Sequence, residues 1–195
     1  MRKLLLLCTV FLFLALTGLS SATILNFDNL SNNAWVPGNY DGFSWGNMVS
    51  FSYSNYNSNY SNTLSAVSGD IFVTNGGGAS ASLSNDADFD FNGAYFTGWV
   101  FEDKEWYGNA HSVTIQGYNN GSLVDTYVAT LAIGVMNYFD VGMTSVDQIV
   151  FTSDNNRIFL MDDFTYTEST TVPEPATVLL FGIGLLGLAK VNRKK

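Results

Sequence analysis

The middle of the chain, residues 23–170, is predicted to be all-β, an antiparallel β-sandwich or jelly roll. Short runs rich in Val, Ile, Phe, Tyr and Thr recur about every 8–15 residues, separated by Gly, Asn, Asp and Ser. No segment of this region sustains the 3.6-residue apolar period of an amphipathic helix. Many short strands without alternating helices are typical of sandwiches and jelly rolls.

Ten runs are the candidate strands. In chain order they cover residues 24–27, 48–53, 71–74, 79–83, 94–100, 112–118, 123–131, 138–141, 148–152 and 158–167. Asn119-Asn120-Gly121 separates two of them and predicts a type I′ hairpin, because Asn and Gly accept the positive φ that this turn requires. Antiparallel pairing of neighbouring strands is the expected consequence.

Residues 1–22 have the layout of a secretory signal peptide. Arg2 and Lys3 precede an apolar run, and the segment ends in small residues, so cleavage is expected after Ala22. The secretion translocon is the implied partner. A retained anchor is the alternative, although the apolar run is shorter than the ~20 residues of a spanning helix. The only cysteine, Cys8, lies in this segment, so the exported chain has no disulfide or thiolate site.

Residues 171–195 have a different layout. Pro173 and Pro175 hold Glu174 in a stiff, extended segment. The fourteen residues 176–189 that follow are apolar, glycine or threonine, and as a helix would span roughly 21 Å. That length is short of the ~30 Å hydrocarbon core, so the helix is expected to anchor the chain transiently. The last residues, 190–195, are mostly basic and would stay on the cytoplasmic side.

This terminus resembles the PEP-CTERM sorting signal of exopolysaccharide-producing Gram-negative bacteria. Val172, Pro173, Glu174 and Pro175 match its opening motif, and Gly184-Leu185-Leu186-Gly187-Leu188 matches its glycine-leucine helix. Asn192 departs from the usual uninterrupted basic tip. The resemblance implies that an exosortase cuts at or near the motif. The expected location is an inner-membrane intermediate, then the cell envelope, outer surface or extracellular matrix.

Charge separates the body from its ends. Between the two terminal segments only Lys104 and Arg157 are basic, whereas all seventeen acidic residues lie between Asp28 and Glu174. So acidic a surface repels phosphate backbones, and nucleic-acid binding is therefore not expected. The body also resembles carbohydrate-binding-module or galactose-binding-like sandwiches, through FDFNGAYFTGWVF, VTIQGYNNGSLV and FLMDDFTYT. Fold alone does not fix function.

Two aromatic regions are candidates for glycan binding. Residues 50–65 are nearly all Ser, Asn and Tyr, and Tyr53 and Tyr56 could offer flat faces to a sugar. The alternative is an edge strand running into a solvated loop. Trp99 and Trp106 flank Glu102, Asp103 and Glu105, a set that could instead serve a glycosidase or form an acidic loop. Trp35 and Trp45 are further aromatic candidates for sugar contact.

One further match would suit a hydrolase. Residues 42–46, GFSWG, fit the G-x-S-x-G pattern, and a triad would have to join Ser44, His111 and an acid such as Asp103. A nucleophile elbow needs a helix after the serine, whereas a strand pattern follows here. His111 is expected to be a surface residue at a strand edge. We therefore expect no catalytic residues, and the chain is predicted not to be an enzyme.

A candidate metal site involves the last predicted strand. Residues 158, 160, 162, 164 and 166 are predicted to share one face, which puts the Asp162 carboxylate in an apolar row. Arg157, backbone amides or Ca²⁺ could neutralise the carboxylate. The resemblance to sandwiches implies a structural calcium ion held by Asp28 with Asp162 or Asp163. A bulge with amide hydrogen bonds is the alternative.

The sequence thus predicts an exported, non-catalytic protein with a structural or adhesive role associated with exopolysaccharide or biofilm. Exopolysaccharide is a candidate partner of this protein. The alternative is a glycan-binding module, which exposed aromatic side chains in a groove would favour. A second alternative is a glycoside or ester hydrolase, which needs convergent acids or a Ser–His pair. Dry, buried tryptophans would favour the structural role.

Overall fold

The computed structural model describes residues 21–60, 64–99 and 108–169, and every structural statement below concerns these residues. They form strands, one helix and two 3-10 turns. The strands are β1 (Thr23–Leu25), β2 (Ala34–Trp35), β3 (Ser44–Gly46), β4 (Met48–Ser52), β5 (Ile71–Asn75), β6 (Ala81–Gly98), β7 (Ser112–Asn119), β8 (Ser122–Thr130), β9 (Asn137–Ser153) and β10 (Phe159–Glu168). The helix is α2 (Tyr53–Tyr60), and the turns are η1 (Gly76–Gly78) and η2 (Asp154–Asn156).

All pairs between these strands are antiparallel, which confirms the predicted all-β, antiparallel class. Within the described residues the strands form one hydrogen-bonded network, along the path β2-β4-β5-β10-β6-β9-β7-β8. β1 joins this network on β10, and β3 joins it on β6. Residues 1–20 of the predicted signal peptide and the whole sorting segment lie outside the described residues, whereas Ala22, the predicted cleavage residue, is described and exposed.

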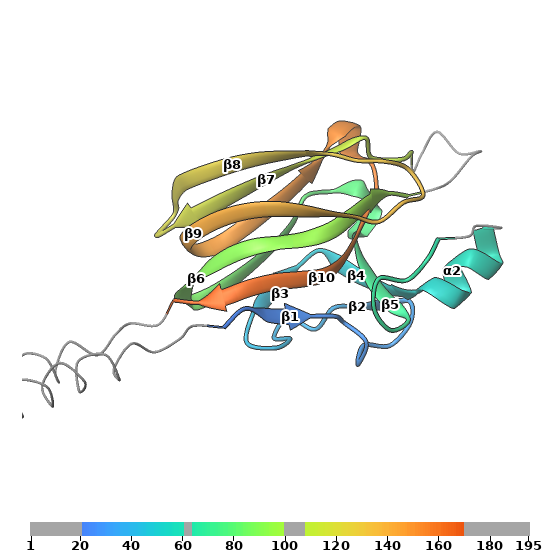
Figure 1. Cartoon of the computed structure of the whole chain (residues 1–195), viewed down its shortest axis with the longest axis horizontal. Coiled ribbons are helices and arrows are strands. Elements are labelled where there is room, and N and C mark those ends of the chain that lie inside the picture. The colour runs from blue at the N-terminus through green and yellow to red at the C-terminus, as the bar shows by residue number, and fades with distance from the viewer. Residues whose placement is uncertain (1–20, 61–63, 100–107, 170–195) are drawn as a thin grey trace, which may run out of the picture. The chain divides into compact units, whose positions relative to one another are not determined.

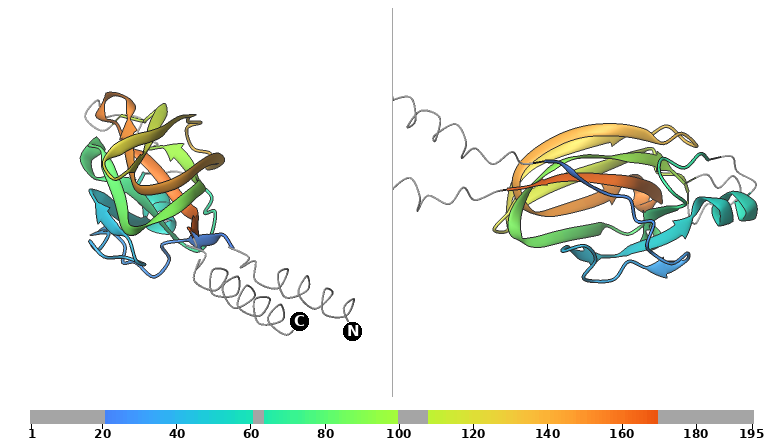
Figure 2. Two further views of the ribbon diagram at one scale, coloured as in Figure 1. Left: turned by 90° about the vertical axis from the view of Figure 1, so that its left-hand side faces the viewer. Right: turned by 60° about the horizontal axis from the view of Figure 1, so that its bottom comes forward.

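The two longest strands fold this network into two layers (Figure 1). One layer contains β8, β7, the second half of β9, the first half of β6 and β3, because β6 residues 81–84 pair with β9 residues 148–151. The other layer contains the first half of β9, the second half of β6, then β10, β5, β4 and β2. The arrangement is a β-sandwich whose layers share β6 and β9, as the end-on view shows (Figure 2).

The register between β6 and β9 is irregular at the place where both strands pass from one layer to the other. The β6–β9 register shifts three times between Ser84 and Gly93, and such bulges bend a strand and increase its twist. At this bend the sequence of β6 alternates acidic and aromatic residues, so Phe89 and Phe91 are buried while Asp88 is exposed. We predicted two strands in each of these regions. That prediction was wrong, because the polar residues of each bend belong to a single continuous strand.

The main core lies between the layers and is largely aromatic. Phe91 and Phe164 stack with centroids 4.6 Å apart and planes 8° apart, and Phe43 packs edge-on against Phe89 at 5.0 Å. The strand pattern explains this packing, because alternate residues on a strand point to the same face. In β7, for example, Val113 and Ile115 are buried and their neighbours are partly exposed.

Helix α2 corrects the expected edge strand and loop at residues 50–65. Ser52 caps its first turn, since the Ser52 Oγ accepts a hydrogen bond from the Asn55 N–H at 3.1 Å. Tyr53 and Tyr56, three residues apart, face the protein and are buried. Composition rich in Ser and Asn favours loops, but burial of this aromatic pair outweighs that local preference.

The hairpin prediction is confirmed. Asn120 and Gly121 connect β7 to β8 with φ of 49° and 75°, the left-handed values of a type I′ turn. Among the residues that the structure describes, no helix has the length and apolar character needed to span a bilayer.

Candidate functional site

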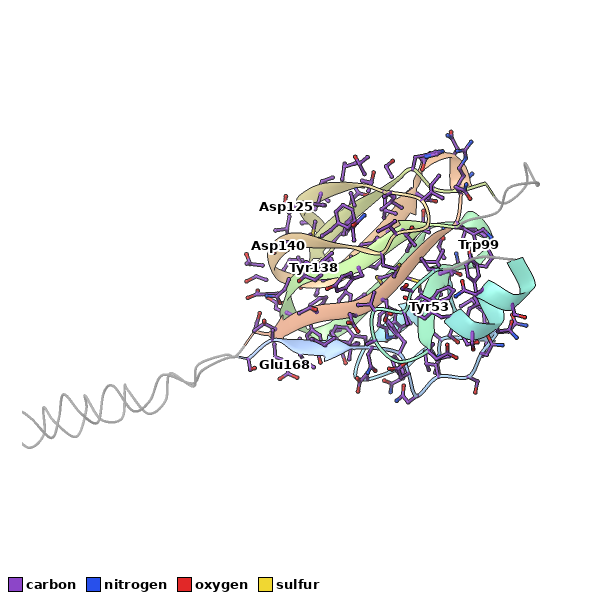
Figure 3. The ribbon with its side chains drawn as sticks, turned by 45° about the vertical axis from the view of Figure 1, so that its right-hand side comes forward. Tyr53, Trp99, Asp125, Tyr138, Asp140 and Glu168 are labelled. Atoms are coloured by element: carbon purple, nitrogen blue, oxygen red, sulfur yellow. The ribbon has the colours of Figure 1, made fainter. Side chains whose placement is uncertain are left out.

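A second, smaller core lies beside α2, and we call it the α2 cluster. It contains the buried side chains of Tyr53, Tyr56, Leu64, Phe72, Trp99, Ile158 and Leu160. The Tyr56 ring packs edge-on against Trp99 at 4.7 Å and against Phe72 at 5.4 Å. Figure 3 shows Tyr53 and Trp99 on the α2 side of the molecule.

The α2 cluster overturns three of the four predicted glycan contacts. Tyr53, Tyr56 and Trp99 are all buried, so their faces are occupied by protein and cannot stack on a sugar ring from solution. The fourth residue, Trp106, lies outside the described residues. The sequence signal was ambiguous because Tyr and Trp serve equally well in a core and on a surface.

The other two tryptophans have opposite environments. Trp45 is buried, and its indole N–H donates to the Tyr40 carbonyl at 3.0 Å. Trp35, on the two-residue strand β2, is 65% exposed. Its ring rests on the η1 turn, where a side chain at Gly76 would meet the ring carbons at 2.8 Å. Trp35 is therefore a fixed, exposed aromatic face.

Asp162 is a fully buried carboxylate. It lies on β10 beside the α2 cluster. The Tyr53 hydroxyl donates to its Oδ2 at 2.8 Å, and the Asp163 N–H donates to its Oδ1 at 2.8 Å. The pair of Tyr53 and Asp162 joins the start of α2 to the last strand.

The predicted face of β10 is only half right, for a structural reason. The register between β10 and β6 shifts after Asp162, and Asp163 has a positive φ of 48°. This bulge turns the strand over, so Phe164 and Tyr166 enter the main core whereas Leu160 belongs to the α2 cluster. A bulge with amide hydrogen bonds was the predicted alternative to calcium. Arg157 is not the partner, since its guanidinium donates to the Asn109 carbonyl at 3.3 Å.

Burial raises the pKa of the Asp162 carboxyl from 3.8 to about 7, and the neighbouring Asp163 and Asp28 charges add to the shift. The hydrogen bonds from Tyr53 and the Asp163 N–H act the other way, because they stabilise the carboxylate. Burial also raises the pKa of the Tyr53 hydroxyl, and the Asp162 charge raises it further. At neutral pH the Tyr53 hydroxyl therefore keeps its proton and donates it in the hydrogen bond to Asp162, and Asp162 itself can be protonated.

The other two predicted calcium ligands serve as hydrogen-bond acceptors. Asp28 Oδ1 accepts from the N–H groups of Asp70 at 2.9 Å and Ile71 at 3.2 Å. Asp163 Oδ1 accepts from the Ser68 hydroxyl at 2.6 Å. No group of three or more His, Cys, Asp or Glu side chains in the described ranges is placed to hold a metal ion. The three aspartates are thus not brought together as a calcium site, and calcium binding stays a prediction.

The hydrolase alternatives gain no support from the described residues. Ser44 lies inside β3, pairs with Ser84, and is followed by β4 rather than by a helix, so it does not stand on a nucleophile elbow. His111 is exposed, and its backbone N–H donates to Asp154 Oδ1 at 2.7 Å. Glu102, Asp103 and Glu105 lie outside the described residues.

Replacing Asp162 by asparagine is expected to stabilise the protein at alkaline pH. The folded chain holds the Asp162 proton more tightly than the unfolded chain, so the wild-type free energy of unfolding falls as pH rises from about 4 to about 7. The introduced amide stays uncharged and can bond both the Asp163 N–H and the Tyr53 oxygen. For Asp162→Asn we expect a stability similar to wild type near pH 4 and a gain of about 4 kcal/mol at pH 8.

Urea unfolding across that pH range measures this effect. Asp125→Asn, which removes one exposed carboxylate on β8, controls for the change in net charge. A gain for Asp162→Asn that is the same at pH 4 and pH 8 would contradict the assignment of a buried, proton-binding carboxyl.

Comparison with known protein families identifies the C-terminal segment. Residues 171–194 match the model of the PEP-CTERM protein-sorting motif. The chain carries a PEP-CTERM sorting motif. The motif confirms the resemblance seen at Val172, Pro173, Glu174 and Pro175, and it implies processing by an exosortase and export for sorting to the cell surface. No curated protein matches the chain.

Two solved structures are similar to the body of this chain. One is the X-ray structure of GH31 CBM32-2 bound to GalNAc, with 12% identity and a TM-score of 0.33, covering 77% of this chain and 95% of that chain. The other is TmCBM61 in complex with β-1,4-galactotriose, with 14% identity and a TM-score of 0.33, covering 74% and 94%. Because both TM-scores are low, we assign the β-sandwich fold from the strand pairing described above and not from these two similarities.

Proposed function

We propose that this PEP-CTERM protein is a non-catalytic structural or adhesive component of the cell envelope or extracellular matrix. One observation carries the proposal. Four of the aromatic side chains that the sequence suggests for ligand contact are buried and pack inside the protein: Tyr53, Tyr56, Trp45 and Trp99. A body whose aromatic residues pack internally is suited to a stable structural role rather than to binding a ligand in a deep cleft.

The acidic composition supports the same role. A chain with two basic residues against sixteen acidic ones outside its terminal segments stays soluble at the surface and offers many carboxylates to a hydrated matrix. The sorting motif would place this body where an exopolysaccharide matrix forms. Association with exopolysaccharide or biofilm is part of the proposal.

Glycan binding is the second candidate, and Trp35 is the observation that favours it. Its ring is exposed and is held against η1. A fixed aromatic face of this kind can stack on a sugar, because aromatic rings and apolar sugar faces pack together without a deep pocket. In this glycan-binding hypothesis, the buried residues Tyr53, Tyr56 and Trp99 do not contact the sugar.

One experiment separates the two candidates. A strain of the native host that lacks the gene is complemented with the wild-type chain or with Trp35→Ala, and the resistance of its matrix to shear is measured. We expect the deletion to weaken the matrix several-fold and both chains to restore it. Restoration by the wild type alone would favour glycan binding through Trp35. A deletion strain with unchanged matrix would contradict the structural role.

A further inference from the structure

The free edge of β8 is an exposed apolar strand. β8 ends the strand path and pairs only with β7 among the described strands, so its second edge has no strand partner there. Leu123, Val124 and Val128 are all more than half exposed. The strand has one charge, Asp125, and no lysine or proline. Sheet proteins usually protect such edges with charge, proline, β-bulges or short strands, and of these devices β8 has only Asp125 and the irregular register at Val124.

The opposite end of the strand path cannot pair along the length of β8. β2 has two residues, whereas β8 has nine, and β3, the end strand of the layer that contains β8, has three. Head-to-tail pairing of β8 with either would leave most of the β8 edge without hydrogen bonds. A second β8 offers the same nine residues, and a pair related by a two-fold axis closes after two copies.

The β8 sequence is complementary to itself about its central residue, Thr126. An antiparallel pair centred there places Val124 opposite the partner subunit's Val128. It places Asp125 opposite the partner subunit's Tyr127, whose hydroxyl can donate a hydrogen bond, rather than opposite another carboxylate. Cross-strand pairs of β-branched residues stabilise such a ladder, whereas like charges directly opposite one another destabilise it.

We propose that two copies of this protein associate through their β8 edges, in an antiparallel pair that extends the sheet across the dimer. The strand supplies main-chain hydrogen bonds and an apolar strip, and the symmetric register keeps its single carboxylate away from its counterpart. This association goes beyond the proposed matrix role and holds whether or not that role is correct.

Charge sets the expected salt dependence of this contact. The two bodies carry the same negative sign, so their long-range repulsion is screened as ionic strength rises. Hydrogen bonds and apolar contacts along β8 do not depend on that screening. Pairing should therefore strengthen with added salt. An edge occupied by a basic partner would show the opposite trend.

Cysteine cross-linking tests the proposal on the full chain in its native host. The chain has one cysteine, Cys8, inside the predicted signal peptide, so an introduced cysteine is expected to be the only thiol after export. Single variants Val124→Cys, Thr126→Cys and Val128→Cys are treated on intact cells with a short bis-maleimide. Three positions are used because Val124 lies at a bulge in the β7–β8 register, which can displace the pairing by one residue.

A cross-linked species of twice the monomer mass, more abundant at high salt, is the expected result for at least one of these positions. Ile24→Cys is the matched control, because Ile24 on β1 is 58% exposed, as is Val128. It should give at least about five-fold less dimer at equal surface level. Adding Val128→Lys to the Thr126→Cys chain should reduce the dimer by a similar factor, because two lysines then enter the paired edges.

Surface level and protease resistance of each variant show that the sandwich is folded. Absence of dimer from all three positions, or equal dimer from Ile24→Cys, would overturn the proposal. A cross-linked product of another mass, or one that weakens with salt, would also overturn it and would assign the edge to a different partner. If the β8 dimer forms but deletion of the gene leaves the matrix unchanged, the β8 pairing is supported and only the proposed matrix role is contradicted.

Discussion

Replacing Phe164 by alanine is expected to lower the free energy of unfolding of the sandwich by about 3–5 kcal/mol. Phe164 is fully buried, stacks on Phe91 at 4.6 Å, and also contacts Phe43 and Trp45 at ring distances of 6.0 Å. These partners come from β3 and its preceding turn and from β6, so a cavity at this position loosens contacts among three parts of the sandwich. A loss of this size is a large share of the roughly 5–15 kcal/mol typical of a domain.

Urea unfolding of residues 20–169, which form one compact unit, measures the loss. Ile24→Ala is the matched control, because Ile24 is exposed and pairs with the next residue of β10, Thr165. Its effect should stay within about 0.5 kcal/mol. A Phe164→Ala loss as small as the control would mean that the layers do not enclose a common core at this position.

Replacing Pro173 and Pro175 together by alanine is expected to abolish processing of the C-terminal segment. The two prolines restrict φ and hold the residues before them extended, which is the form in which a protease reads a chain. Without them the segment could join the helix that the sequence predicts for residues 176–189, and Glu174 would then no longer lie in an extended segment. The variant should accumulate with its tail intact, in the membrane fraction, at the expense of the surface form.

Cell fractionation with detection of the body measures this redistribution. Asn192→Arg, which completes the basic tip without touching the motif, is the control and should be processed as the wild type. A double proline variant that still reaches the surface at the wild-type level would contradict a role for this motif in sorting.

The sequence predicts the fold class well where local pattern decides it. Short β-rich runs and the Asn-Gly hairpin need only neighbouring residues; the hairpin agrees with the structure, and so does the all-β class, although β6 and β9 were each predicted as two strands. The sorting motif is also local, and for that reason Val172 to Pro175 together with the glycine-leucine segment, residues 184–188, were sufficient to find it.

Other features depend on contacts far apart in the chain. Tyr53 and Asp162 are 109 residues apart, and nothing near either residue indicates that they meet. The β10 bulge at Asp163 reverses the faces of the strand in a way that strict alternation cannot show. The apolar row around Asp162 did indicate that a buried carboxylate needs a partner, although it left the partner's identity open.

Dependence on long-range contacts also explains why the glycan-binding residues were predicted wrongly. The composition of residues 50–65 favours an exposed loop, and only the packing of Tyr56 on Phe72 and Trp99 turns this segment into a buried helix face. Trp35 shows the reverse case, since a two-residue strand has no period and its exposure follows from its position at the end of the strand path.

The central claim is that this chain is exported and sorted through a C-terminal segment that processing removes. Mass spectrometry of the surface form, isolated from the native host and digested, tests it most directly. The account predicts that the last detected peptide ends at or near Pro173-Glu174-Pro175 and that no peptide covers residues 176–195. Surface material that retains every residue to Lys195 would contradict it.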